Sequence, residues 1–114
     1  MKPLLLPMIL GALLLTGACQ KSPEDQRADD LRAAARVQAK AVTDQAGSVA
    51  TAMDKQAADL GGQAKTAGGF TGERLKTRSD ALEREADIVK RQGEARARAI
   101  KDTAKAQAES IHSR

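Results

Sequence analysis

The chain has 114 residues and a formal net charge of +4, with one phenylalanine and no tryptophan or tyrosine. A chain of this length holds one domain at most, and its sparse large aliphatic side chains bury too little apolar area to offset the entropy of a compact globule. Charges of both signs are interspersed, which argues against a nucleic-acid partner. Richness in Ala, Glu, Lys and Arg favours long helices.

Residues 1–18 have the organisation of an export signal. Lys2 provides a minimal positive start, and residues 3–15 form an apolar segment that is too short for a transmembrane helix of about 20 residues. Three small residues, the last of them Ala18, directly precede Cys19. We expect cleavage between Ala18 and Cys19. Loss of Lys2 from a chain of charge +4 leaves +3 on the mature side chains.

The sequence LTGAC at residues 15–19 resembles the lipobox of bacterial lipoproteins, although Thr16 stands where leucine is more usual. The resemblance implies that Cys19 carries a diacylglyceryl group on sulfur and that its new amino group is acylated, for example with palmitate. Two or three acyl chains anchor a protein permanently, whereas a single chain is marginal. Gln20 stands where aspartate is the usual inner-membrane retention signal in this family, so the resemblance implies an outer-membrane protein facing the periplasm.

Two other interpretations of Cys19 are open. A secreted protein with a free thiol has a similar small-residue cleavage site, and a structural buried thiol is the third interpretation. A lone cysteine in an oxidising compartment invites stray disulfides, and acylation prevents them. Lipidation is therefore the favoured interpretation.

The mature chain is expected to be all-α, with two long Ala-rich amphipathic helices joined by a Gly-rich linker. A lipidated cysteine and short tether occupy 19–22, and the first helix covers 23–60. Residues 61–72 contain five glycines and form the expected linker. The second helix covers 73–112. Two helices of similar length around a glycine-rich break favour a helical hairpin.

Local signals mark the helix starts. Ser22 can cap the first helix, with Pro23 at its first position. Thr71 is expected to cap the second helix.

Apolar residues recur every 11 residues along both expected helices, which corresponds to about 3.67 residues per turn and a nearly straight helix. The clearest series are Leu31, Val42 and Met53; Ala35, Ala46 and Ala57; Ala86, Ala97 and Ala108; and Val89, Ile100 and Ile111. Folding the chain back at the glycines makes large residues meet small ones, with Val42 facing Gly93 and Val49 facing Ala86. This pattern favours a coiled-coil-like pair, within one chain or between chains. An open pair of helices or a partly disordered chain is the alternative.

The second helix also carries acid-to-base pairs four residues apart, each worth about 0.2–0.5 kcal/mol. They are Asp80–Arg84, Asp87–Arg91 and Glu94–Arg98. A solvated, self-supporting surface is the favoured interpretation, and a docking face is the alternative.

Residues that carry chemistry are sparse. His112 is the single histidine and Cys19 the single cysteine, so they do not complete a metal site. His112 lies near a chain end, where residues are usually mobile. Phe70 is expected to cap the end of the hairpin rather than stack on a ligand. We predict no enzymatic activity, no cofactor and no metal.

The general plan resembles the small helical murein lipoproteins: a lipid cysteine, a short tether and a repeat-patterned helix. It departs from them in its glycine linker and in ending at Arg114 rather than at the lysine that joins those proteins to peptidoglycan. The expected function is that of a lipid-anchored, non-enzymatic cell-envelope protein with a structural or docking role in the periplasm. It contacts the membrane through the acyl chains on Cys19, and its candidate partners are an envelope protein, peptidoglycan or a second copy of the chain. The alternative is a stress-protectant amphipathic helix similar to late-embryogenesis-abundant proteins.

Overall fold

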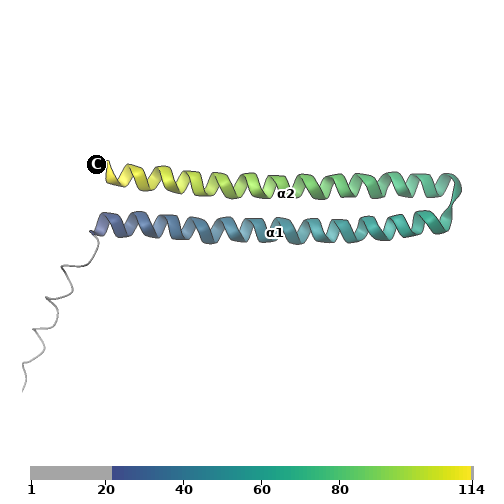
Figure 1. Ribbon diagram of the computed structural model, residues 1–114, viewed down its shortest axis with the longest axis horizontal. Helices are drawn as coiled ribbons and strands as arrows, with labels where there is room; N and C mark the ends of the chain where they lie inside the picture. Colours follow the sequence, from purple (N-terminus) through teal and green to yellow (C-terminus); the bar gives the residue numbers. More distant parts are fainter. Residues whose placement is uncertain (1–21, 114) are drawn as a thin grey trace, which may run out of the picture.

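The computed structural model describes residues 22–113, which form two helices. Helix α1 covers Pro23–Ala67 and helix α2 covers Gly69–His112. The helices lie side by side and antiparallel, so the start of α1 and the end of α2 meet at one open end (Figure 1). At about 1.5 Å per residue, each helix is roughly 67 Å long. The predicted all-α helical hairpin is confirmed.

The start of α1 follows the predicted capping chemistry. The Ser22 hydroxyl oxygen accepts a hydrogen bond from the backbone N–H of Asp25 at 3.1 Å. Pro23 occupies the first turn, where its missing N–H costs nothing. Glu24 and Asp25 place negative charge beside the positive end of the helix dipole. The first helix therefore has a sharp beginning at Pro23.

The turn of the hairpin is much shorter than the predicted linker over 61–72. Only Gly68 separates α1 from α2. Gly68 and Gly69 have φ angles of 64° and 57°, in the left-handed region that glycine enters without steric cost. The Gly68 N–H donates to the Ala64 carbonyl at 3.0 Å and closes the last turn of α1. Two consecutive glycines in this conformation are enough to reverse the chain.

The other glycines of the predicted linker lie inside helices. Gly61 and Gly62 belong to α1, and Gly72 belongs to the first turn of α2. At Gly72, a Cβ atom would lie 2.6 Å from the carbonyl oxygen of Ala64, so this glycine permits close approach of the helices rather than a turn. The predicted linker bounds of 61–72 were wrong because the prediction took every glycine in this stretch as a break in the helix. A glycine inside a helix destabilises it by only about 0.5–1 kcal/mol relative to alanine, so a long helix can contain several. The predicted Thr71 cap was also wrong, since Gly68 is the N-cap and no side chain caps α2.

Small residues fill the seam between the two helices. None of the large apolar side chains in the described part of the chain is fully buried. Small residues favour the short end of the roughly 8–10 Å range of interaxial distances. The buried residues are Ala28, Ala35, Ala39, Ala50 and Ala57 on α1, and Gly72, Ser79, Ala86, Gly93, Ala97, Ala104 and Ala108 on α2.

The register of the two helices agrees with the predicted one to within a helical turn. A Cβ atom added to Gly93 would overlap the Cβ of Ala46 and would lie 3.8 Å from the Val42 carbonyl oxygen. Gly93 therefore lies between these two residues, close to its predicted partner Val42. Val49 was predicted to lie in the seam but is 42% exposed, and Ala50 is buried instead.

Candidate functional site

The residues predicted to be modified, Ala18 at the cleavage position and Cys19 at the lipidation position, lie outside the described residues. What the structure does describe is the chain directly after them. Helix α1 begins at Pro23, so only residues 20–22 separate Cys19 from the hairpin.

The hairpin is a single layer of two helices, with one groove along the seam on each side. On one side the groove is lined near the open end by residues that include Leu31, Gln38 and Ile100. Further along it is lined by residues that include Val42, Gln45, Val49, Val89 and Gln92. Arg96 is the single charged residue lining these two stretches. We call this side the neutral face.

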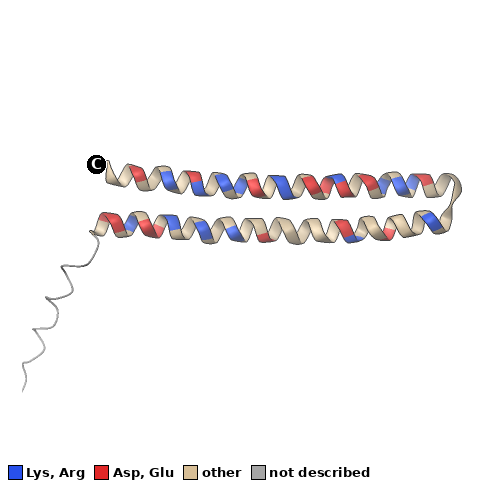
Figure 2. Ribbon diagram, in the orientation of Figure 1, with Lys and Arg blue, Asp and Glu red and all other residues tan. Residues whose placement is uncertain are grey.

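The opposite side carries charges in its groove, and we call it the charged face. Arg32, Arg36, Lys101 and Lys105 line a hollow around Ala35. Because successive helical residues differ by about 100°, Arg32 and Arg36 lie on the other side of the seam from Leu31 and Gln38. Figure 2 shows charges along most of α2, whereas α1 has an uncharged stretch over residues 45–53.

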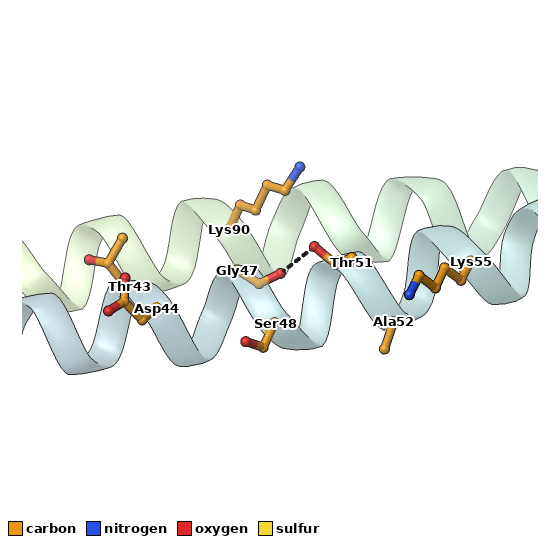
Figure 3. A pocket seen from close by; sticks show the side chains of 8 residues that line it. All are labelled: Thr43, Asp44, Gly47, Ser48, Thr51, Ala52, Lys55 and Lys90. Atoms are coloured by element: carbon orange, nitrogen blue, oxygen red, sulfur yellow. Dashed lines mark hydrogen bonds between the residues drawn. The ribbon is translucent and has the colours of Figure 1, made fainter.

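One hollow on the charged face has a volume of about 690 Å³ and is open to solvent; Figure 3 shows the side chains that line it. Thr51 Oγ1 donates to the Gly47 carbonyl at 2.8 Å, and Thr43 Oγ1 donates to the Ala39 carbonyl at 3.0 Å. The hydrogen of each of these two hydroxyls is therefore donated to a carbonyl of its own helix rather than to a side chain that lines the hollow. The side chains labelled in Figure 3 do not converge on a common point. This hollow has the character of a solvated groove.

Within residues 22–113, two contacts between polar side chains connect the helices. His112 Nδ1 lies 3.3 Å from Asp25 Oδ1 at the open end, and Lys90 Nζ lies 4.0 Å from Asp54 Oδ2 on the charged face. Sequence reasoning assigned His112 to a mobile end and missed its contact with Asp25. All four side chains are close to half-exposed, so each pair contributes little to stability but helps to fix the register.

Within α1, Lys40 Nζ lies 2.7 Å from Asp44 Oδ2. The hydrogen bond that Lys40 donates to the Asp44 carboxylate, and then the negative charge of that carboxylate, raise the pKa of Lys40 above its ordinary value of 10.5. Both side chains are well exposed, so water screens the pair.

The predicted acid-to-base pairs on α2 do not form ion pairs in the part of the chain that the structure describes. Arg84 Nε instead donates to the backbone carbonyl of Asp80 at 3.3 Å. These side chains lie on the solvated surface of α2, where water competes with an exposed ion pair. The acid-to-base spacing therefore defines a polar surface rather than a set of closed contacts.

Ser79 is the polar residue of the seam that sequence reasoning missed. Its hydroxyl is buried and donates across the seam to the Ala57 carbonyl at 2.6 Å. The signal that could have located Ser79 is a series of small residues spaced seven apart: Gly72, Ser79, Ala86 and Gly93.

Phe70 lies at the closed end of the hairpin but does not seal the seam, because its side chain is 75% exposed. The guanidinium carbon of Arg74 lies 6.0 Å from the centre of the ring. Phe70 therefore lies at the predicted end of the hairpin, but its ring does not pack over that end as predicted.

No protein-family model, curated protein or solved structure matches this chain. Within residues 22–113, no group of three or more His, Cys, Asp or Glu side chains is placed to hold a metal ion. Neither helix of that region is apolar enough along its length to cross a membrane. The function therefore has to be argued from the residues of this chain.

Proposed function

We propose that this chain is a lipid-anchored, non-enzymatic protein of the bacterial cell envelope, with a structural or docking role in the periplasm. The observation that carries the proposal is the order of its first residues: an apolar segment over 3–15, three small residues, and then the single cysteine, Cys19. Acyl chains on Cys19 would hold the hairpin at the outer membrane.

The start of the hairpin supports a mechanical link between the anchor and the helices. Residues 20–22 span roughly 10 Å at most, at about 3.5 Å per residue. Ser22, the last of these three residues, caps α1, so few residues separate the proposed anchor from a rigid element. The open end then stays near the membrane, and the turn at Gly68 projects up to roughly 67 Å away. Such a rod suits spacing or docking.

Hydroxyl groups in the seam and on the charged face support a role without catalysis. The buried Ser79 hydroxyl is bonded to the Ala57 carbonyl, and the hydroxyls of Thr43 and Thr51 are bonded to carbonyls of their own helix. The hollows are open grooves rather than enclosed pockets that would perturb the pKa of a catalytic group. Each of these features is that of a packed rod.

The test is the mass of the protein extracted from the membranes of a bacterium that expresses the whole chain. We expect a polypeptide beginning at Cys19 with the added mass of a diacylglyceryl group and a further acyl chain. The Cys19→Ser variant is the control, and it should lack that added mass. Recovery of the unchanged chain with its first 18 residues intact and without fatty acids would overturn the proposal.

A second candidate function, a stress-protectant helix that folds on lipid or on drying, is favoured by one observation. No large apolar side chain of the described residues is fully buried, so the stabilisation from apolar burial is small. Circular dichroism of residues 20–114 separates the two functions. High helix content in plain buffer favours the anchored rod, and a coil that becomes helical only with lipid or on drying favours the protectant.

A further inference from the structure

The large apolar side chains of the hairpin lie beside the seam rather than in it. Leu31 and Ile100 line the neutral face near the open end, and Val42 and Val89 line it in the middle. Each of these four remains partly exposed, and Val49 on the same face is 42% exposed. Met53 and Leu60 follow Val42 and Val49 by 11 residues and continue the same row. One row of large side chains therefore runs along the neutral face without a complete cover.

The polar positions of this face on α1 are uncharged over most of its length. Between Leu31 and Leu60, helical spacing places only alanine and glutamine beside the large side chains, at Ala34, Gln38, Gln45 and Gln56. Charged residues of α2 border the face at Arg78, Glu85 and Arg96. The α1 side of this face therefore has no charge to repel the α2 side of a second copy, and glutamine can both donate and accept hydrogen bonds across a contact.

We propose that the neutral face binds the neutral face of a second copy of this chain, so that four helices enclose the side chains that one hairpin leaves half-exposed. The uncharged row from Leu31 to Leu60 is about 44 Å long at 1.5 Å per residue, and two packed helices are about 20 Å wide. The face therefore offers on the order of 900 Å² per copy, compared with about 800 Å² per partner in a standard stable interface.

A membrane surface fits the neutral face less well than a second copy does. Helices that lie in a membrane interface carry Lys and Arg beside their apolar side. Here glutamine and alanine take those positions on α1. On α2 the bordering arginines Arg78 and Arg96 alternate with the acidic Glu85. The basic cluster of the hairpin, Arg32, Arg36, Lys101 and Lys105, lines the opposite face. The charge distribution thus favours a contact between protein surfaces.

The chain that precedes the hairpin sets the direction of the two copies. Residues 1–21 join α1 at the open end, so two copies anchored in one membrane point the same way; this direction rests on the proposed lipid anchor. A two-fold axis parallel to the helices then places α1 of one copy against α2 of the other at the same height. Val42 of each copy would meet the region of Val89 and Gly93 of the other.

Sedimentation equilibrium of the whole chain, extracted in a density-matched detergent, tests the contact. We expect a dimer for the unchanged protein and for the control Thr51→Glu, which places the same charge on an exposed residue of the charged face. Val49→Glu should weaken the dimer at least about 30-fold, because each dimer then buries two unpaired carboxylates. Val49 is 42% exposed in a single hairpin, so that hairpin should keep its helix content by circular dichroism.

The direction is tested with a spin label on Thr66→Cys, an exposed position near the turn. Pulsed electron resonance should give a distance below about 40 Å between labels in the parallel dimer, against roughly 65 Å or more if the copies were antiparallel. A protein that stays monomeric at all concentrations, or a dimer that Val49→Glu leaves unchanged, would overturn the proposed face. A long distance would overturn the parallel arrangement. The mass of the same sample reports the anchor separately, so an acylated monomer contradicts the dimer alone.

Discussion

Replacing Gly93 with alanine distinguishes a packed hairpin from two independent helices. In an exposed helix interior, glycine to alanine stabilises by about 1 kcal/mol. At Gly93 the added methyl group would overlap the Cβ of Ala46 on the opposite helix. At Gly47, which also lies in a helix interior, an added Cβ meets nothing within 4 Å. The same substitution therefore has opposite expected effects at these two positions.

The magnitude follows from two opposing contributions. Overpacking a close contact costs about 1–3 kcal/mol, and the gain in helix propensity offsets about 1 kcal/mol of that cost. We expect Gly93→Ala to lower the free energy of unfolding by about 1 kcal/mol, and Gly47→Ala to raise it by about 1 kcal/mol. The two variants should differ by roughly 2 kcal/mol in the free energy of unfolding.

Thermal unfolding of residues 20–114, followed by circular dichroism, measures the difference. For a domain of this size, 1 kcal/mol corresponds to about 4–8 °C in Tm. Gly93→Ala should therefore unfold roughly 10 °C below Gly47→Ala. The double variant Ala46→Gly/Gly93→Ala moves the methyl group from one helix to the other and should recover part of the loss, as a coupling between contacting residues. Equal stabilisation by both alanine substitutions would refute the packed seam at this height.

Three further predictions concern the seam, the turn and a surface ion pair. Ser79→Ala should lower the free energy of unfolding by about 1 kcal/mol, because the hydrogen bond from the Ser79 hydroxyl to the Ala57 carbonyl is lost, whereas that carbonyl still belongs to the backbone of α1. Urea unfolding measures the change. Gly68→Ala should destabilise by about 1–2 kcal/mol in the same assay, because φ is 64° there. Asp44→Asn should lower the pKa of Lys40 toward 10.5, followed by NMR titration of its side chain. The pair's stabilisation is present at neutral pH and is lost as the pH rises through the raised pKa of Lys40.

The first two of these predictions have matched controls in the same chain. Ser48→Ala changes an exposed hydroxyl and should leave the free energy of unfolding nearly unchanged. Gly62→Ala changes a helical glycine with nothing within 4 Å of the added Cβ and should stabilise. If Gly68→Ala stabilised as Gly62→Ala does, the turn at Gly68 would be misplaced. If Ser48→Ala lowered the free energy of unfolding as much as Ser79→Ala, the hydrogen bond between Ser79 and Ala57 would not explain the effect of Ser79→Ala.

The hairpin itself could be predicted from the sequence because its signals are local. Ser22 and Pro23 fix the start of α1 through capping chemistry that depends on a few neighbouring residues. The 11-residue series on each helix indicated which side of that helix faces the other, and it predicted the register of the two helices to within one turn. These features follow from the period of the helix and need no knowledge of the partner atoms.

The turn could not be placed from the sequence because glycine has two uses that look alike in a sequence. Gly68 and Gly69 adopt positive φ, whereas Gly72 lies in a helix against the Ala64 carbonyl. The choice between a flexible position and a close approach depends on the backbone of the opposite helix. The same holds for Ser79, whose partner is a carbonyl 22 residues away along the chain.

The exposure of Val49 shows how the repeat is divided between two surfaces. In α1 one set of positions spaced by 11, Ala28, Ala39 and Ala50, is buried in the seam. The large residues Leu31, Val42 and Met53 share that spacing, but each follows a seam alanine by three residues and so points about 60° away from it around the helix. These large residues stay partly exposed. The small residues in the seam let the two helices approach closely. A large side chain at one of these positions would push the helices apart. A repeat that supplies both sets has more apolar surface than one hairpin can cover. The large set is therefore the part of the sequence pattern that the fold of a single chain does not use, and the Val49→Glu variant examines it directly.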